Sequence, residues 1–172
     1  MNTPNNKRKK ESMLKIEKVF LELIQTKEIN EISVTDICKK ANLNRTTFYS
    51  NYIDIYDLAD KIKEKLEKDV FDLYKDVNKN KYSSDNFFKL FKHIKENQIF
   101  YKTYFKLGFD KNFIIKEYDL TQAYEYYSHD KIDYHIAFFK AGLNAIITKW
   151  LYSGCIESPE EMAEIIEKEY KK

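Results

Sequence analysis

Three helix starts follow one another between Ser33 and Leu58, and this spacing constrains the fold more than any other feature of the sequence. Ser33 can cap a helix that has Asp36 at its third position, and Asn44 and Asp54 can cap two more. In each case a side-chain oxygen satisfies backbone N–H groups that a helix start leaves without a partner. Apolar pairs beside the caps fix the direction of entry into each helix: Ile32 with Ile37, Leu43 with Phe48, and Ile53 with Leu58. The segment therefore predicts three helices joined by short turns.

The turn between the first two of these helices, Ala41-Asn42-Leu43, predicts a helix-turn-helix. Asn42 can take the left-handed conformation that a tight turn needs. Two helices joined by three or four residues, the second short and polar on its outer face, form such a motif. Its inward side chains are Val34, Ile37, Cys38, Ala41, Leu43 and Phe48, and the outward ones on the second helix are Arg45, Thr46, Thr47, Tyr49 and Ser50. A plain helical hairpin that binds no nucleic acid is the alternative.

The motif resembles the DNA-binding domain of TetR-family transcriptional regulators. The residues on positions that match the family's pattern are Ile37, Ala41, Leu43, Phe48, Tyr49, Tyr52 and Leu58. Three positions depart from it: Asn42 stands for the usual Gly, Asn51 for the usual His, and Ile55 for a Lys that contacts a phosphate in many members. The resemblance is strongest over residues 8–65, and residues 141–166 resemble C-terminal domains in one branch of the family. It implies an all-α fold and binding to double-stranded DNA.

A recognition helix that lies in the major groove offers its N-terminal residues to base edges. We therefore expect Arg45, Thr46 and Thr47 near bases, with the remaining outward residues and Tyr52 near phosphates. Charge agrees with this expectation, since residues 1–50 hold ten Lys and Arg against six Asp and Glu while the whole chain carries only +2. The full predicted DNA-binding set is Lys7, Arg8, Ser33, Thr35, Asn44, Arg45, Thr46, Thr47, Tyr49, Ser50 and Tyr52.

The chain is expected to divide into three parts: a flexible basic arm at 1–10, a helix-turn-helix domain at 11–58 that includes the start of a linking helix, and a helical ligand-binding and dimerisation domain at 59–172. The arm either follows DNA phosphates or acts as a solubilising tail. Apolar periodicity predicts a first helix from Lys10 to about Gln25 and a long linking helix from Asp54 towards Val77. The charged face of the linking helix, which includes Lys61 and Lys65, is expected to be solvated.

Aromatic residues gather in the C-terminal half, where 20 of the 27 lie from Tyr82 onward. Aromatic walls suit ligand sites, so we predict a pocket for a small apolar or aromatic effector. Its predicted lining is Phe91, Tyr101, Tyr104, Phe105 and Tyr124. The alternatives are a core packed with Phe and Tyr, and a C-terminal surface that recruits a partner protein in place of a small ligand.

The segment from Asp130 to Gly154 predicts a helix that is apolar on nearly every side, and a capping box at Ser158 and Glu161 starts the last helix. A helix apolar all round must be covered all round, and a domain of this size has few helices to cover it. We therefore predict a homodimer, as TetR-type dimerisation through a four-helix bundle also implies. Its predicted interface residues are Ile136, Phe139, Ala141, Leu143, Ile147, Trp150, Met162 and Ile166.

No residue pattern in the chain predicts catalysis. The histidines have no Asp, Glu or Cys at a metal-ligand spacing, and neither a Gly-rich phosphate loop nor a nucleophile motif occurs. We therefore predict no enzyme activity, no catalytic residue, no metal site and no cofactor. The two cysteines are expected to be free thiols, and the lack of a signal peptide or membrane-spanning run predicts a cytoplasmic protein without membrane contact.

Together these features predict a homodimeric, sequence-specific DNA-binding transcriptional regulator that acts on a palindromic operator. We expect a repressor that a small-molecule effector releases. The alternative is a co-regulator whose C-terminal domain binds a partner protein. In the first case, an effector would tilt the linking helix, and the pair of Ile53 and Leu58 would pass that tilt to the recognition helix and change the spacing of the two recognition helices on DNA.

Overall fold

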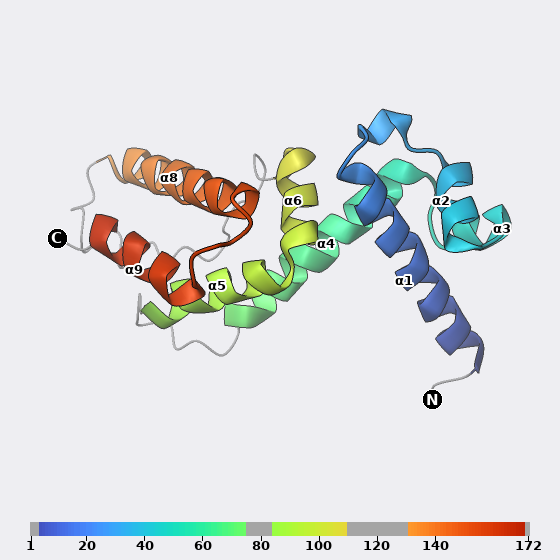
Figure 1. Cartoon of the computed structure of the whole chain (residues 1–172), viewed down its shortest axis with the longest axis horizontal. Coiled ribbons are helices and arrows are strands. Elements are labelled where there is room, and N and C mark those ends of the chain that lie inside the picture. The colour runs from blue at the N-terminus through green and yellow to red at the C-terminus, as the bar shows by residue number, and fades with distance from the viewer. Residues whose placement is uncertain (1–3, 75–83, 110–130, 171–172) are drawn as a thin grey trace. The chain divides into compact units, whose positions relative to one another are not determined.

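The computed structural model describes residues 4–74, 84–109 and 131–170, and every regular element within those ranges is a helix (Figure 1). This confirms the predicted all-α fold. The chain forms two compact units, an N-terminal unit, Met1–Asp69, and a C-terminal unit, Val70–Lys172. The division falls later than the predicted boundary after residue 58, because most of helix α4 (Ile55–Tyr74), as far as Asp69, belongs to the N-terminal unit and buries Leu58, Ile62 and Leu66.

The N-terminal unit is built on its first helix. It consists of α1 (Pro4–Ile24), the short 3-10 helix η1 (Ile29–Glu31), α2 (Val34–Ala41), α3 (Arg45–Tyr49) and most of α4. Helix α1 packs against α2 and α3. It buries Ile16, Phe20 and Ile24 completely, and their spacing of four places them on one face of the helix. The helix-turn-helix packs against that face.

Helix α1 begins at Pro4, so residues 4–10 are helical and the prediction that the first helix starts at Lys10 is wrong. The physical reason is helix propagation. Once the apolar face of α1 is packed, each further residue adds one backbone hydrogen bond to an existing helix. Lys, Arg and Glu, which fill positions 7–11, are good helix formers.

Two of the three predicted caps are present. The Ser33 hydroxyl accepts a hydrogen bond from the Asp36 N–H (3.1 Å), and the Asp36 carboxylate accepts one from the Ser33 N–H (3.3 Å), as a capping box requires. The Asp54 carboxylate accepts a hydrogen bond from the Asp57 N–H at 2.8 Å. These side chains satisfy N–H groups at the starts of α2 and α4.

Two local expectations in the same segment are wrong. The Asn44 side chain makes no capping bond, because the Thr47 N–H that it would satisfy donates to the Asn44 carbonyl at 2.9 Å. The apolar pair of Ile53 and Leu58 does not form either, since Ile53 is 79% exposed while Leu58 is fully buried. Asn42, in contrast, adopts the predicted left-handed conformation, with φ 53° and ψ 51°.

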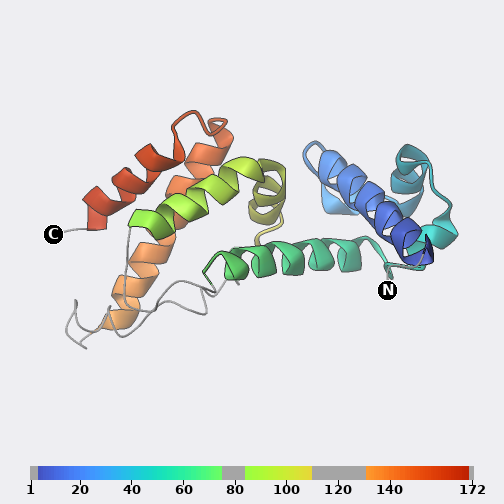
Figure 2. The same cartoon turned by 90° about the horizontal axis from the view of Figure 1, so that it is seen from below.

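The C-terminal unit contains α5 (Ser84–Glu96), α6 (Gln98–Lys106), α8 (Ile132–Tyr152) and α9 (Pro159–Tyr170), with α5 along α9 and α6 against α8 (Figure 2). Trp150 is the largest side chain of its core, and the Phe91 ring meets it edge-on with centroids 5.3 Å apart. The Trp150 indole N–H donates to the Glu157 carbonyl (3.3 Å), so its one polar group is satisfied. The predicted capping box of α9 is present, with bonds of 3.2 and 2.7 Å between Ser158 and Glu161.

Helix α8 has one buried and one exposed face, which corrects the predicted dimer interface. Helices α5 and α6 of the same chain cover its buried face. The predicted interface residues that lie buried within the single chain are therefore core residues, namely Phe139, Leu143, Ile147, Trp150, Met162 and Ile166. Ile136 is half-buried. The exposed face of α8 carries instead the exposed α8 strip, which we define as Tyr134, Phe138, Ala141, Ala145 and Tyr152.

We expect Ser33→Ala to lower the free energy of unfolding by about 1 kcal/mol, because it removes the side-chain acceptor at the start of α2. Urea unfolding monitored by circular dichroism measures this change. Asn44→Ala is the matched control, since that side chain makes no capping bond, and it should cost clearly less. Equal losses in the two variants would contradict the assignment of the caps.

Candidate nucleic-acid interface

One buried side chain anchors α3, and the other side chains of this short helix face outward. Phe48 is fully buried, and its ring meets those of Tyr49 and Tyr52 at centroid distances of 5.6 and 5.4 Å. Thr47 is half-buried. The structure thus brings together most of the predicted recognition residues on one polar surface, and the exposed ones are Asn44, Arg45, Thr46, Tyr49 and Ser50.

Arg45 and Tyr49 form a pair on this surface, one helical turn apart. The Arg45 guanidinium donates a hydrogen bond to the Tyr49 hydroxyl (3.4 Å), and its central carbon lies 5.9 Å from the centroid of the Tyr49 ring. The hydrogen bond to Tyr49 raises the pKa of Arg45 above its already high ordinary value. The guanidinium therefore stays charged and exposed, and its fork of donors suits guanine O6 and N7 in a major groove.

Tyr52 does not belong to this surface, and its predicted contact with a phosphate is wrong. Its side chain is 2% exposed, and its hydroxyl donates to the Glu17 carboxylate at 3.3 Å. Burial, together with the negative charge of Glu17, raises the pKa of Tyr52. The physical reason is position: Tyr52 follows Phe48 by four residues and its backbone N–H bonds to the Phe48 carbonyl (2.9 Å), so both rings point into the core.

The remaining predicted DNA-binding residues lie at the starts of two other helices. Lys7 and Arg8 are exposed on α1, and Ser33 and Thr35 are exposed at the start of α2. The Ser33 hydroxyl already donates to the Asp36 carboxylate (2.8 Å), and hydrogen bonds from Ser33 lower the pKa of Asp36. Ser33 therefore serves first as a helix cap.

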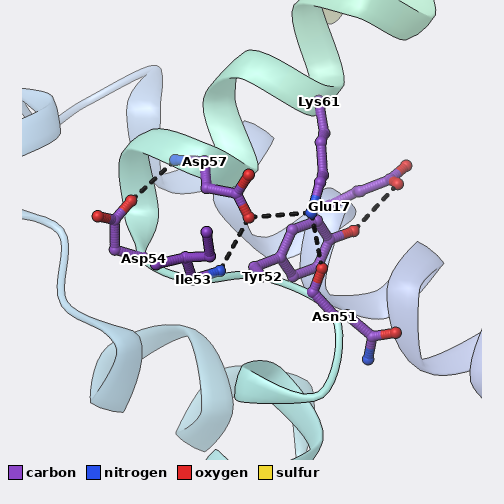
Figure 3. A network of polar contacts seen from close by, with 7 residues as sticks. All are labelled: Glu17, Asn51, Tyr52, Ile53, Asp54, Asp57 and Lys61. Carbon is purple, nitrogen blue, oxygen red and sulfur yellow. Dashed lines mark hydrogen bonds and ion pairs between the residues drawn. The ribbon is translucent and has the colours of Figure 1, made fainter.

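A polar network follows α3 in the chain, and it includes Lys61, which was expected to lie on a solvated face (Figure 3). The Lys61 ammonium group donates to the Asn51 carbonyl (2.9 Å) and to the Asp57 carboxylate (3.0 Å), and it lies 5.1 Å from the centroid of the Tyr52 ring. The carboxylate of Asp57 also accepts from the Ile53 N–H at 2.8 Å. Lys61 thus joins α4 to the turn that follows α3.

A second bond of this network crosses to α1. The Lys65 ammonium group donates to the Glu17 carboxylate at 2.9 Å, and the same carboxylate accepts from Tyr52. The bond between Lys61 and Asp57 could have been expected from their spacing of four residues on one helix. No signal in the sequence indicates the bond between Lys65 and Glu17, because packing brings α1 and α4 together.

The predicted effector residues fall into separate contacts within the C-terminal unit. Phe91 is fully buried and packs against α8. Tyr104 and Phe105 meet edge-on with centroids 6.1 Å apart, and both Tyr101 and Tyr104 are 6% exposed. Tyr124 lies outside the described residues. The structure therefore places Tyr104 beside Phe105, and it places Phe91 in the core around α8.

Metal binding and membrane crossing have no support in the described ranges. Within them, no group of three or more His, Cys, Asp or Glu side chains is placed to hold a metal ion. No helix in the same ranges combines the length and the apolar character that crossing a bilayer requires. Cys38 and Cys155 are free thiols as expected, and burial raises the pKa of each.

Three comparisons place the chain among known proteins. Residues 81–171 match a family model described as a transcriptional regulator C-terminal region. The chain is 32% identical over 123 residues to the HTH-type dhaKLM operon transcriptional activator DhaS of Lactococcus lactis subsp. lactis (strain IL1403), a match that covers 70% of this chain and 64%, just under two thirds, of that relative's length. Among solved structures, the dihydroxyacetone kinase operon activator DhaS matches with a TM-score of 0.59 and 25% identity, over 91% of this chain and 92% of that one.

We expect Asp57→Asn to reduce the loss of stability in acid. The Ile53 N–H and then Lys61 hold the pKa of Asp57 below its ordinary value of 3.8. A carboxylate whose pKa is lowered by folding stabilises the protein above its unfolded pKa, and this contribution is lost as pH falls below about 4. Urea unfolding at pH 7 and at about pH 3 measures the difference.

Asp60→Asn is the matched control, because Asp60 is an exposed carboxylate on the same helix. The other carboxylates still contribute in both variants, so the readout is the difference between them. An identical acid loss in the two variants would show that Asp57 makes no special contribution.

Proposed function

We propose that this chain, which belongs to the TetR family of transcriptional regulators, is a homodimeric regulator that reads a palindromic DNA site with α3. The observation that carries the proposal is the division of α3 into a buried anchor, Phe48, and an exposed polar surface led by Arg45. A helix of this kind can enter a major groove because its anchor fixes which side chains point away from the domain. Such an activity places the protein with the chromosome, in the cytoplasm.

The DNA surface that we propose is smaller than the predicted set, because Tyr52 is buried. It consists of Arg45, Thr46, Thr47, Tyr49 and Ser50. Asn44, Thr35, Lys7 and Arg8 are exposed and suit phosphate contacts on either side of the groove, where Lys, Arg and small polar side chains commonly bind. Ile55, which replaces a phosphate-binding Lys of the family, is 7% exposed and contributes no such contact.

The exposed α8 strip supports the proposed dimer. Two large aromatic side chains of the strip, Tyr134 and Phe138, are 76% and 74% exposed, and Ala141 and Ala145 continue the same face. Small residues between aromatic ones allow a second helix to approach closely. A symmetric pairing of two such strips would cover this face. Binding to a palindromic site would then require the two recognition helices to lie roughly 34–36 Å apart, one turn of DNA.

The control of DNA binding is the second part of the proposal. We propose a small apolar or aromatic effector in the C-terminal unit near Tyr101, Tyr104 and Phe105, three of the four aromatic residues of α6. The alternative is a partner protein that binds the C-terminal unit. Thermal shift against a library of metabolites separates the two, because a pocket ligand raises the melting temperature by itself.

The sign of regulation has two candidates. Repression relieved by an effector is the expectation from the sequence. Activation is favoured by the relative, whose name describes an operon transcriptional activator. A reporter that carries the selected DNA site separates them: deleting the gene raises transcription if the protein represses and lowers it if the protein activates.

We expect Arg45→Ala to weaken binding to a DNA duplex selected from a random library by roughly 1–3 kcal/mol, and to change binding to unrelated duplex little. The physical reason is the loss of a bidentate base contact. Fluorescence anisotropy at fixed salt measures both affinities. Lys68→Ala is the control, because Lys68 is an exposed cation of α4 outside the proposed surface. An equal loss on both duplexes would make Arg45 a phosphate contact.

We expect Ala141→Glu to convert the dimer into a folded monomer and to abolish tight DNA binding. Ala141 is exposed in the single chain, so a charge is tolerated by the fold but would be buried unpaired between subunits. Sedimentation velocity at micromolar concentration measures whether the protein is a dimer or a monomer. Lys92→Gln on α5 changes the net charge by the same amount outside the strip and should remain dimeric. A monomeric unmodified protein would overturn the proposed dimer.

A further inference from the structure

Helix α3 spans only Arg45–Tyr49, so its position must come from contacts with the rest of the N-terminal unit. Isolated helices shorter than about 12 residues are marginal in water. Its N-terminal end receives no side-chain capping bond from Asn44. At the other end, the backbone N–H groups of Ser50 and Tyr52 bond back to Thr46 and Phe48 carbonyls at 3.0 and 2.9 Å. Besides the buried Phe48, the turn after α3 is therefore a second place where this helix can be held.

Lys61 closes that turn against α4. Its ammonium group donates to the backbone carbonyl of Asn51, two residues beyond the end of α3, at 2.9 Å. The same group binds Asp57 at 3.0 Å, and Asp57 holds the Ile53 N–H at 2.8 Å. Lys61 of α4 is therefore bonded to both sides of the turn, directly to Asn51 and through Asp57 to Ile53.

Tyr52 connects this group of contacts to α1. Its ring packs on Phe48 of α3 and lies below the Lys61 cation, while its hydroxyl binds Glu17 of α1. Glu17 in turn binds Lys65, one turn beyond Lys61 on α4. The side chain of Glu17 is 12% exposed, so this ion pair is partly shielded from solvent. We call Glu17, Tyr52, Asp57, Lys61 and Lys65 the α4 clamp.

We infer that Lys61 is a positioning residue for DNA reading, because it bonds the turn that follows α3 to α4 and so holds the exposed surface of α3 in place. The inference rests on the proposed function of α3 as the reading helix. It replaces the predicted connection through Ile53 and Leu58, which does not form because Ile53 is exposed.

A phosphate contact is the competing role for Lys61, whose side chain is 44% exposed. The two roles differ in their salt dependence. A lysine that neutralises a phosphate contributes about one unit to the slope of log affinity against log salt, and its removal lowers that slope. A positioning lysine leaves the slope unchanged, because it releases no counterion from DNA.

The test compares Lys61→Met with Lys68→Met, which removes the same charge from an exposed position farther along α4. Lys61→Met should weaken binding to the selected duplex roughly three- to tenfold, the range expected for one partly exposed charged tie. Binding to unrelated duplex and the salt slope should not change, and Lys61→Arg should restore affinity. Lys68→Met should match the unmodified protein. A salt slope lowered by about one, or equal effects of the two Met variants, would overturn the inference.

Amide hydrogen exchange tests the clamp without DNA. Lys61→Met should speed exchange of the Ser50, Asn51 and Tyr52 amides roughly three- to tenfold through local opening, and leave the amides of α1 unchanged. Unchanged exchange at these three amides would refute the clamp. Failure of the unmodified protein to select any duplex would instead refute the proposed function. Tyr52→Phe, which keeps the ring and removes only the bond to Glu17, provides a second variant that preserves the core.

Discussion

The burial of Phe48 is the interaction on which the candidate interface depends. Fully burying a phenylalanine contributes about 1.5–3 kcal/mol, and Phe48 is the one side chain of α3 that is fully buried. Because α3 is a single turn and a half of helix, fixing this one residue fixes the direction of every other. Arg45, Thr46 and Tyr49 are exposed because Phe48 is not. A helix with a second buried residue would have less surface left for DNA.

Packing fixes the direction of α3, and a polar network restrains its position. The α4 clamp combines charged groups with a buried aromatic ring. Hydrogen bonds give each polar atom named in it a partner. An exposed ion pair alone contributes little. Lys61 has further contacts besides its ion pair, with the backbone carbonyl of Asn51 and with the face of the buried Tyr52 ring.

In the C-terminal unit, apolar packing dominates the contacts between helices. Trp150 and Phe91 form the centre of a core to which α5, α8 and α9 contribute, and the Trp150 indole N–H meets a carbonyl in the turn that leads to α9. Helix α8 is apolar on both faces, yet the described helices of its own chain contact only one of them. The other face keeps Tyr134 and Phe138 exposed, which is the physical basis for expecting a second subunit there.

The sequence by itself determined the local structure: the caps at Ser33, Asp54 and Ser158, the left-handed turn at Asn42, the all-α fold and the family. Each of these caps and the turn depends on atoms within a few residues of one another, so spacing can identify them, although the same spacing also predicted a cap at Asn44 that does not form. Only the tertiary structure decided that Tyr52 is buried, that Lys65 reaches Glu17, and which face of α8 is core. Those outcomes depend on which helix packs beside which, and an apolar or charged residue looks the same in a sequence whichever neighbour covers it.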